Sequence, residues 1–151
     1  MLAASTLAAW LDGLPEILEA VTPEDLGSGG SARFHYVGRK RAVEEAVADR
    51  SFGLSLVGTA TLTPDQAGDA IEYVQPVALR VRYRGQSADP HALNKRIASD
   101  RRQLVRALYL PSNRVSSDVL GLSVDGMLIE PDEENQLIDV VFSLSLTFRE
   151  R

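Results

Sequence analysis

The sequence contains no cysteine and only two histidines, His35 and His91. Disulfides and thiolate metal sites are therefore excluded, and the redox compartment is not indicated. The histidines stand alone, without the spacing to acids that a metal site or a nucleophile–base pair requires. Glycine-rich phosphate loops and the Gly-x-Ser-x-Gly nucleophile motif are also missing. We therefore expect no enzyme activity, no cofactor and no metal.

Long apolar runs are absent as well, because no stretch approaches the roughly 20 residues of a membrane-spanning helix. The N-terminus lacks the basic start and apolar stretch of a signal peptide. Sixteen basic and 21 acidic residues give a formal charge of −5, which argues against non-specific nucleic-acid binding by the whole surface. Apolar residues make up 44% of 151 residues, enough for the core of one domain. We expect one soluble domain over residues 1–151, with no membrane contact.

What the sequence does contain is a long alternating pattern near its C-terminus. Between residues 137 and 149, six apolar residues fall on every second position: Ile138, Val140, Phe142, Leu144, Leu146 and Phe148. Side chains of a strand alternate between the two faces of a sheet, so this pattern predicts a strand with one apolar and one wet face. Burying six such side chains is worth roughly 9–18 kcal/mol at most. The strand therefore needs neighbouring strands and a covering layer.

The remaining segments supply these neighbours. Apolar residues at three- and four-residue intervals predict a helix over residues 2–21, with Trp10 in the core. A glycine- and serine-rich stretch predicts a flexible loop at about residues 22–32. Residues 52–62 and 71–83 predict one antiparallel hairpin, and residues 119–129 with the last strand predict a second. Pro90 opens the strongest helix pattern, residues 90–110, with Arg96 and Asp100 expected on its outer face.

These elements predict an α+β fold. Its mainly antiparallel sheet is built from two hairpins, and the N-terminal helix and the long middle helix pack on one of its faces. Asp125 and Gly126 mark a bulge or a break in the strand that they occupy.

Two groups of arginines lie on the expected wet faces. Arg80, Arg82 and Arg84 alternate along one strand, and Arg101, Arg102 and Arg106 lie on the middle helix. Like charges in line repel one another unless acids face them. Each group is therefore either a solvated face or a contact with an acidic partner surface, and both interpretations stay open. An acidic hairpin tip offers one such surface: Asp132, Glu133 and Glu134.

The chain resembles the tail terminator proteins of long-tailed bacteriophages. The features that carry the resemblance are the strands at residues 51–57, 77–83 and 140–148, the helix at residues 92–108, and their order. The resemblance covers most of the chain and is a pattern of elements, with no invariant signature.

The resemblance implies a structural virion protein. Such proteins form a six-membered ring on the head-proximal end of the tail tube, stop its polymerisation and give the head–tail connector a surface to join. DNA passes through the ring without being read. The implied location is the tail or neck of the virion, and the host cytoplasm during assembly.

A ring uses heterologous contacts, in which one patch meets a different patch on the next copy. We therefore expect the arginines of either group to meet acids of a neighbouring copy or of another tail protein. Two other functions stay open: another neck or tail-completion component, and a nucleic-acid-binding module.

Overall fold

The computed structural model describes residues 6–24, 33–38, 43, 49–63, 70–84, 90–132 and 136–150, without the side chains of residues 90–92 and 132. Its first half contains helix α1 (Thr6–Glu19) and strands β1 (His35–Gly38), β2 (Ser51–Leu56), β3 (Thr61–Leu62) and β4 (Ile71–Arg84). Its second half contains helix α3 (Pro90–Tyr109), a short 3-10 helix η1 (Pro111–Asn113), and strands β5 (Val119–Asp132) and β6 (Leu137–Glu150). Most of the flexible loop expected at residues 22–32 lies outside the described residues.

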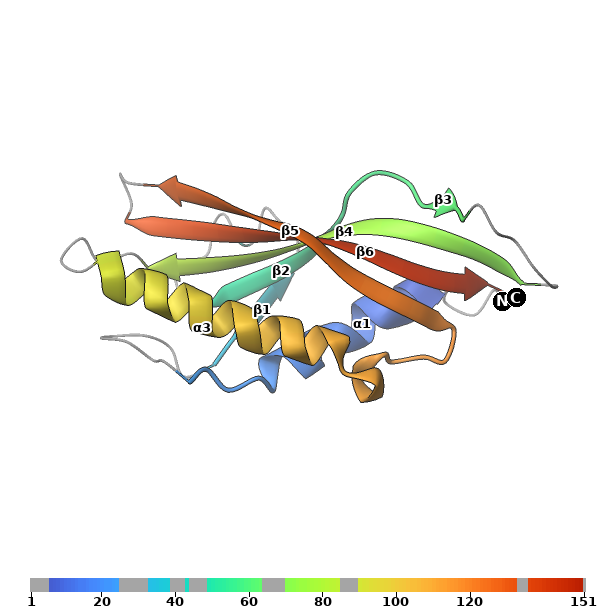
Figure 1. The fold of residues 1–151 in the computed structure, drawn as a ribbon, viewed down its shortest axis with the longest axis horizontal. Coiled ribbons are helices and arrows are strands. Elements are labelled where there is room, and N and C mark those ends of the chain that lie inside the picture. Colours follow the sequence, from blue (N-terminus) through green and yellow to red (C-terminus); the bar gives the residue numbers. More distant parts are fainter. Residues whose placement is uncertain are drawn as a thin grey trace.

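The strands form one mixed sheet in the order β1-β2-β4-β6-β5, with β3 pairing with β4 beyond the end of β2 (Figure 1). Both expected hairpins are confirmed, because β4 pairs antiparallel with β2 and β3, and β6 pairs antiparallel with β5. β4 and β6 lie side by side along their whole lengths. The pairing of β1 with β2 is parallel. The last strand thus has a neighbour along each edge, as its pattern requires.

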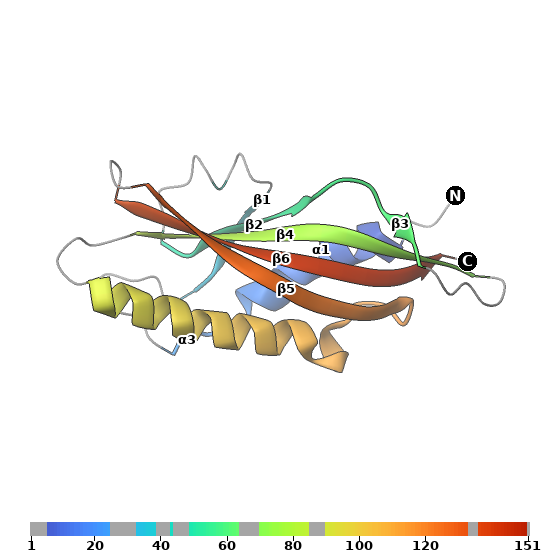
Figure 2. The ribbon, with the colours of Figure 1, turned by 45° about the horizontal axis from the view of Figure 1, so that its top comes forward.

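Both helices cover the same face of this sheet (Figure 2). The face consists of alternate residues of β4 and β6, which come into register as Val81 with Val140 and Leu79 with Phe142. Trp10 is buried against it, as expected. The core formed in this way includes three residues of α1, four of α3 and five of β6: Trp10, Leu14 and Leu18; Leu93, Ile97, Leu104 and Leu108; Val140, Phe142, Leu144, Leu146 and Phe148.

The expected strand at residues 52–62 is interrupted. Gly58 adopts a φ of 74°, which favours glycine, and its carbonyl accepts a hydrogen bond from the Gln75 side chain at 3.2 Å. The chain therefore leaves β4 after Leu56 and returns to it at β3. In contrast, Pro15 lies inside α1 without ending it. In β5, the register shifts between Val124 and Gly126, so the expected irregularity is a bulge.

Candidate functional site

The arginines of β4 lie on the sheet face opposite the helices, and two of them are already paired. Arg82 donates to both carboxylate oxygens of Asp139, at 2.6 and 3.0 Å. Arg80 donates to Asp139 at 2.7 Å and to Glu130 at 2.8 Å. Burial lowers the pKa of Arg80, but its hydrogen bonds to these two carboxylates, together with their negative charges, outweigh burial and raise that pKa above its usual value. Both guanidinium groups are satisfied within the chain.

The interpretation of this row as a solvated face is therefore wrong for Arg80 and Arg82, which are only 8% and 7% exposed. The reason is strand register, because β6 places Asp139 directly opposite Arg82. The expectation that acids must face such a row holds, but the acids belong to the same chain. Arg84 is exposed, and its backbone N–H donates to Asp49 at 3.0 Å.

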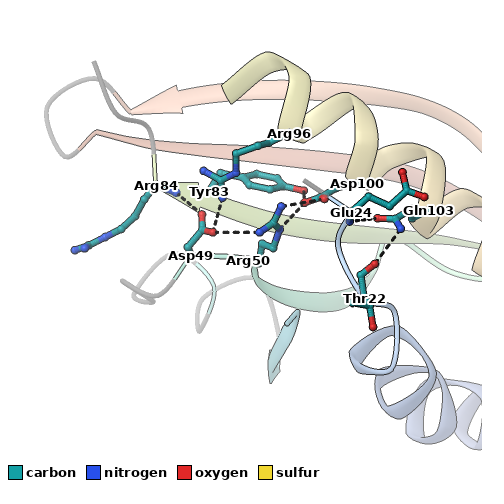
Figure 3. A network of polar contacts seen from close by, with 9 residues as sticks. All are labelled: Thr22, Glu24, Asp49, Arg50, Tyr83, Arg84, Arg96, Asp100 and Gln103. Carbon is teal, nitrogen blue, oxygen red and sulfur yellow. Dashed lines mark hydrogen bonds and ion pairs between the residues drawn. The ribbon is translucent and has the colours of Figure 1, made fainter. Parts of the chain in front are cut away.

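A second polar cluster is buried between α3 and the ends of β2 and β4 (Figure 3). Arg50 is fully buried and donates to both carboxylate oxygens of Asp100, at 2.7 and 3.1 Å. The hydroxyl of Tyr83 donates to the same carboxylate at 2.8 Å. Arg96 forms a buried ion pair with Asp49. These contacts fix α3 to the sheet, and the two arginines balance the two aspartates.

This cluster corrects the expectation that Arg96 and Asp100 lie on the outer face of the middle helix. The two residues are four apart, so both lie on one side of α3, and that side faces β4. Their partners Asp49 and Arg50 lie in the turn before β2, about 50 positions earlier in the sequence. Helical periodicity alone does not connect such distant charges, so only the fold brings them together.

The remaining arginine candidates are exposed, as expected. Arg101, Arg102 and Arg106 point away from the core of α3. Arg102 lies 3.8 Å from the carboxylate of Glu24, in an exposed pair. Such a pair is worth little. The acidic tip cannot be placed beside them, because Glu133, Glu134 and the side chain of Asp132 lie outside the described residues. The six arginine candidates, which the structure describes, therefore divide between two faces of the molecule and form no single site.

Apolar side chains are exposed near both edges of the sheet. On the β5 edge, Leu128 is 57% exposed and Ile129 is 45% exposed. The opposite edge, formed by β3 and its neighbours, exposes three more: Leu56, Leu62 and Ile71. Part of β5 is covered, because the backbone N–H of Val124 donates to the hydroxyl of Tyr109 at 2.9 Å. Sequence periodicity did not reveal these patches, because an apolar residue in a strand pattern is normally assigned to the core.

Among the described residues, no three of the residue types His, Cys, Asp and Glu are grouped so that they hold a metal ion. No helix in this part of the chain is long and apolar enough to cross a membrane. No protein-family model matches the sequence, and a comparison with curated proteins finds no match.

Proposed function

We propose that this chain is a tail terminator of a long-tailed bacteriophage. In this role, copies form a ring on the head-proximal end of the tail tube, stop its polymerisation and present a surface to the head–tail connector. Support comes from the order of elements that underlies the family resemblance, which the folded chain retains from α1 to β6. The ring part of the proposal depends on a surface feature.

That feature is the pair of exposed apolar edges. β5 is one edge strand of the twisted sheet, and β3 pairs with β4 on the side away from β6 and β5, so the two patches lie at opposite edges (Figure 1). Leu128 is exposed at the first edge and Leu62, at 61%, at the second. Exposed apolar patches of this kind mark interaction sites. Because the patches differ, contact of one copy's β5 edge with the next copy's β3 edge is heterologous, and a heterologous contact whose rotation closes gives a ring.

The charged candidates refine this proposal. Arg80 and Arg82 hold Asp139 and Glu130 within the chain, so they support the sheet near β5 and do not face a neighbour. Arg101, Arg102 and Arg106 remain exposed on the helix layer, where they are open to another copy or to another tail protein. The edges thus connect copies, and the helix layer is left for a second kind of contact.

A tube-length assay tests this function. Tail-tube protein of the same virus is polymerised with and without the purified chain, and tubes are measured by electron microscopy. We expect shorter tubes with a ring at one end. The variant Leu128→Asp should lose this effect, because it places a charge in the apolar contact. Leu110→Asp is the control, since Leu110 is also an exposed leucine, at 46%, but lies in the helix layer away from both edges. Unchanged tube lengths with the wild-type chain would rule out the function.

One observation favours a second candidate, a nucleic-acid-binding module. The exposed surface of α3 carries four cations, Lys95, Arg101, Arg102 and Arg106, and its single acid, Asp100, is buried. Duplex DNA binding that weakens steeply with salt would support this function. Retention of the chain on tube ends, without DNA binding at moderate ionic strength, would favour the tail terminator.

A further inference from the structure

The outward line of α1 is acidic. Asp12, Glu16 and Glu19 are all exposed, and they fall within about 60° of one another around a helix of 3.6 residues per turn. The opposite side of the helix carries the buried residues Trp10 and Leu14. Since α1 contains no lysine or arginine, this line is a stripe of one sign. We call Asp12, Glu16 and Glu19 the acidic stripe.

The outward line of α3 is basic. Lys95, Arg102 and Arg106 are exposed and fall within about 40° of one another, diametrically opposite the buried Leu104. Arg101 is exposed too, but lies about 100° around the helix from Arg102. We call Lys95, Arg102 and Arg106 the basic stripe.

The two stripes match in sign and in spacing. Asp12 and Glu16 are four residues apart, as are Arg102 and Arg106, so each pair spans about 6 Å along its helix axis. The helices lie on the same side of the sheet and run in opposite directions (Figures 1 and 2). Electrostatic complementarity of this kind selects the partner and fixes its register.

We propose that the helix layer binds a second copy of this chain, with the acidic stripe of each copy against the basic stripe of the other. Because both stripes belong to one layer, a single two-fold rotation forms both contacts at once. The interface is therefore isologous and closes as a dimer. It differs from the heterologous edge contact of the proposed ring and uses none of the same residues.

An apolar groove between the stripes supplies burial for this contact. Its volume is about 460 Å³, and it lies between α1 and α3. Ile17, Val21, Ala107 and Leu110 line it, together with Glu16 of the acidic stripe. Leu110 is 46% exposed. Exposed ion pairs contribute little by themselves. The charges therefore orient the two copies, and burial of the apolar groove residues between the two helix layers stabilises the dimer.

Two charge-reversed chains test the interface by mixing. The first carries Arg102→Glu and Arg106→Glu, so both of its stripes are acidic. The second carries Asp12→Lys and Glu16→Lys, so both of its stripes are basic. All chains in this test also carry Leu128→Asp, so that the edge contact of the proposed ring is absent. Sedimentation velocity should show that the chain with Leu128→Asp alone is a dimer, which weakens as salt rises. Each variant alone should be a monomer, with a dimer dissociation constant raised at least about tenfold. An equal mixture should form a mixed dimer, because every contact is again between opposite charges.

The matched control is Arg101→Glu, which makes the same change one residue outside the basic stripe and should keep the dimer of the Leu128→Asp chain. Circular dichroism spectra confirm that each variant is folded. A Leu128→Asp chain that stays monomeric at low salt would overturn the interface, and so would a mixture that fails to pair. The interface rests on the proposed function only in that both require copies to associate. Leu128→Asp separates them, because it should abolish the ring and leave this dimer intact.

Discussion

Tyr83 is a buried phenol whose hydroxyl donates to a carboxylate. It lies at the end of β4, 2.8 Å from Asp100, which also receives two hydrogen bonds from Arg50. Burial, and then the charge and hydrogen bond of Asp100, raise the pKa of Tyr83 well above its ordinary value of 10.0. The folded protein therefore holds the phenol proton more tightly than the unfolded chain does.

This difference predicts a loss of stability at alkaline pH. The stabilisation that the protonated Tyr83 contributes is fully present below its ordinary pKa of 10.0. It is lost as the pH rises from that value toward the higher pKa of the folded protein. In this range, the free energy of unfolding should fall by up to about 1.4 kcal/mol per pH unit. Tyr83→Phe should cost about 1 kcal/mol at neutral pH and should remove this alkaline fall. Urea unfolding between pH 8 and pH 11 measures the free energy of unfolding of both proteins. If this free energy falls equally steeply with pH in both, Tyr83 does not have this role.

Arg82 offers a second prediction at the residue scale. It is buried and forms two hydrogen bonds to Asp139. Replacing it with alanine leaves the buried Asp139 with Arg80 as its remaining partner, so Arg82→Ala should lower the free energy of unfolding by about 3 kcal/mol. Arg101→Ala is the control, because its side chain is exposed, and should change stability by less than about 0.5 kcal/mol. Similar values for the two variants in denaturant unfolding would show that the Asp139 pairs are not structurally important.

The charged residues also show where sequence reasoning stops. Exposure of Arg101, Arg102 and Arg106 followed from their position opposite the apolar stripe of a helix. The burial of Arg82 did not, because its partner Asp139 is 57 positions away and faces it only through the pairing of β4 with β6. The alternation of residues along one strand does not distinguish an arginine exposed to solvent from an arginine paired with an acid on a distant strand of the same chain.

At the scale of elements, the contact between β1 and β2 depends on one glycine. A Cβ atom at Gly53 would lie 2.4 Å from the carbonyl oxygen of Gly38 and 2.6 Å from a methyl group of Val43. Gly38 and Val43 therefore approach β2 more closely than a side chain at position 53 permits.

Gly53→Ala should therefore destabilise the protein by about 1–3 kcal/mol, because the clashing oxygen belongs to the backbone and must move. Gly121→Ala is the matched control, since it makes the same change in a strand where a Cβ atom meets nothing within 4 Å. Thermal unfolding of the two variants compares them. Equal midpoints would contradict the close approach of residues 38 and 43 to β2.

Elements with strong periodicity were predictable, and irregular ones were less so. The alternation in β6 and the helical pattern of α3 each reflect one buried face, so sequence alone located both. The same pattern did not predict the gap between β2 and β3, because that gap depends on Gln75 reaching Gly58 from another strand. The expected helix over residues 2–21 contains Pro15, and α1 continues through it.

At the scale of the whole molecule, the proposed contact surfaces lie in different places, which are the two sheet edges and the helix layer. The two sheet edges expose Leu128 and Leu62 on opposite sides, which suits a repeating contact. The helix layer carries the acidic and basic stripes side by side, which suits a closed pair. The sequence indicated that unlike patches exist, but not which of them face apart, because direction depends on the assembled sheet.

In the proposed ring, copies join through opposite sheet edges and the contacts close on themselves. Negative-stain electron microscopy of the purified chain at increasing concentration, with native mass spectrometry of the same samples, tests it most directly. We predict rings with a central hole and one discrete mass for the wild-type chain, and their loss in Leu128→Asp. Particles without a central hole at every concentration, or rings that persist unchanged in Leu128→Asp, would contradict it.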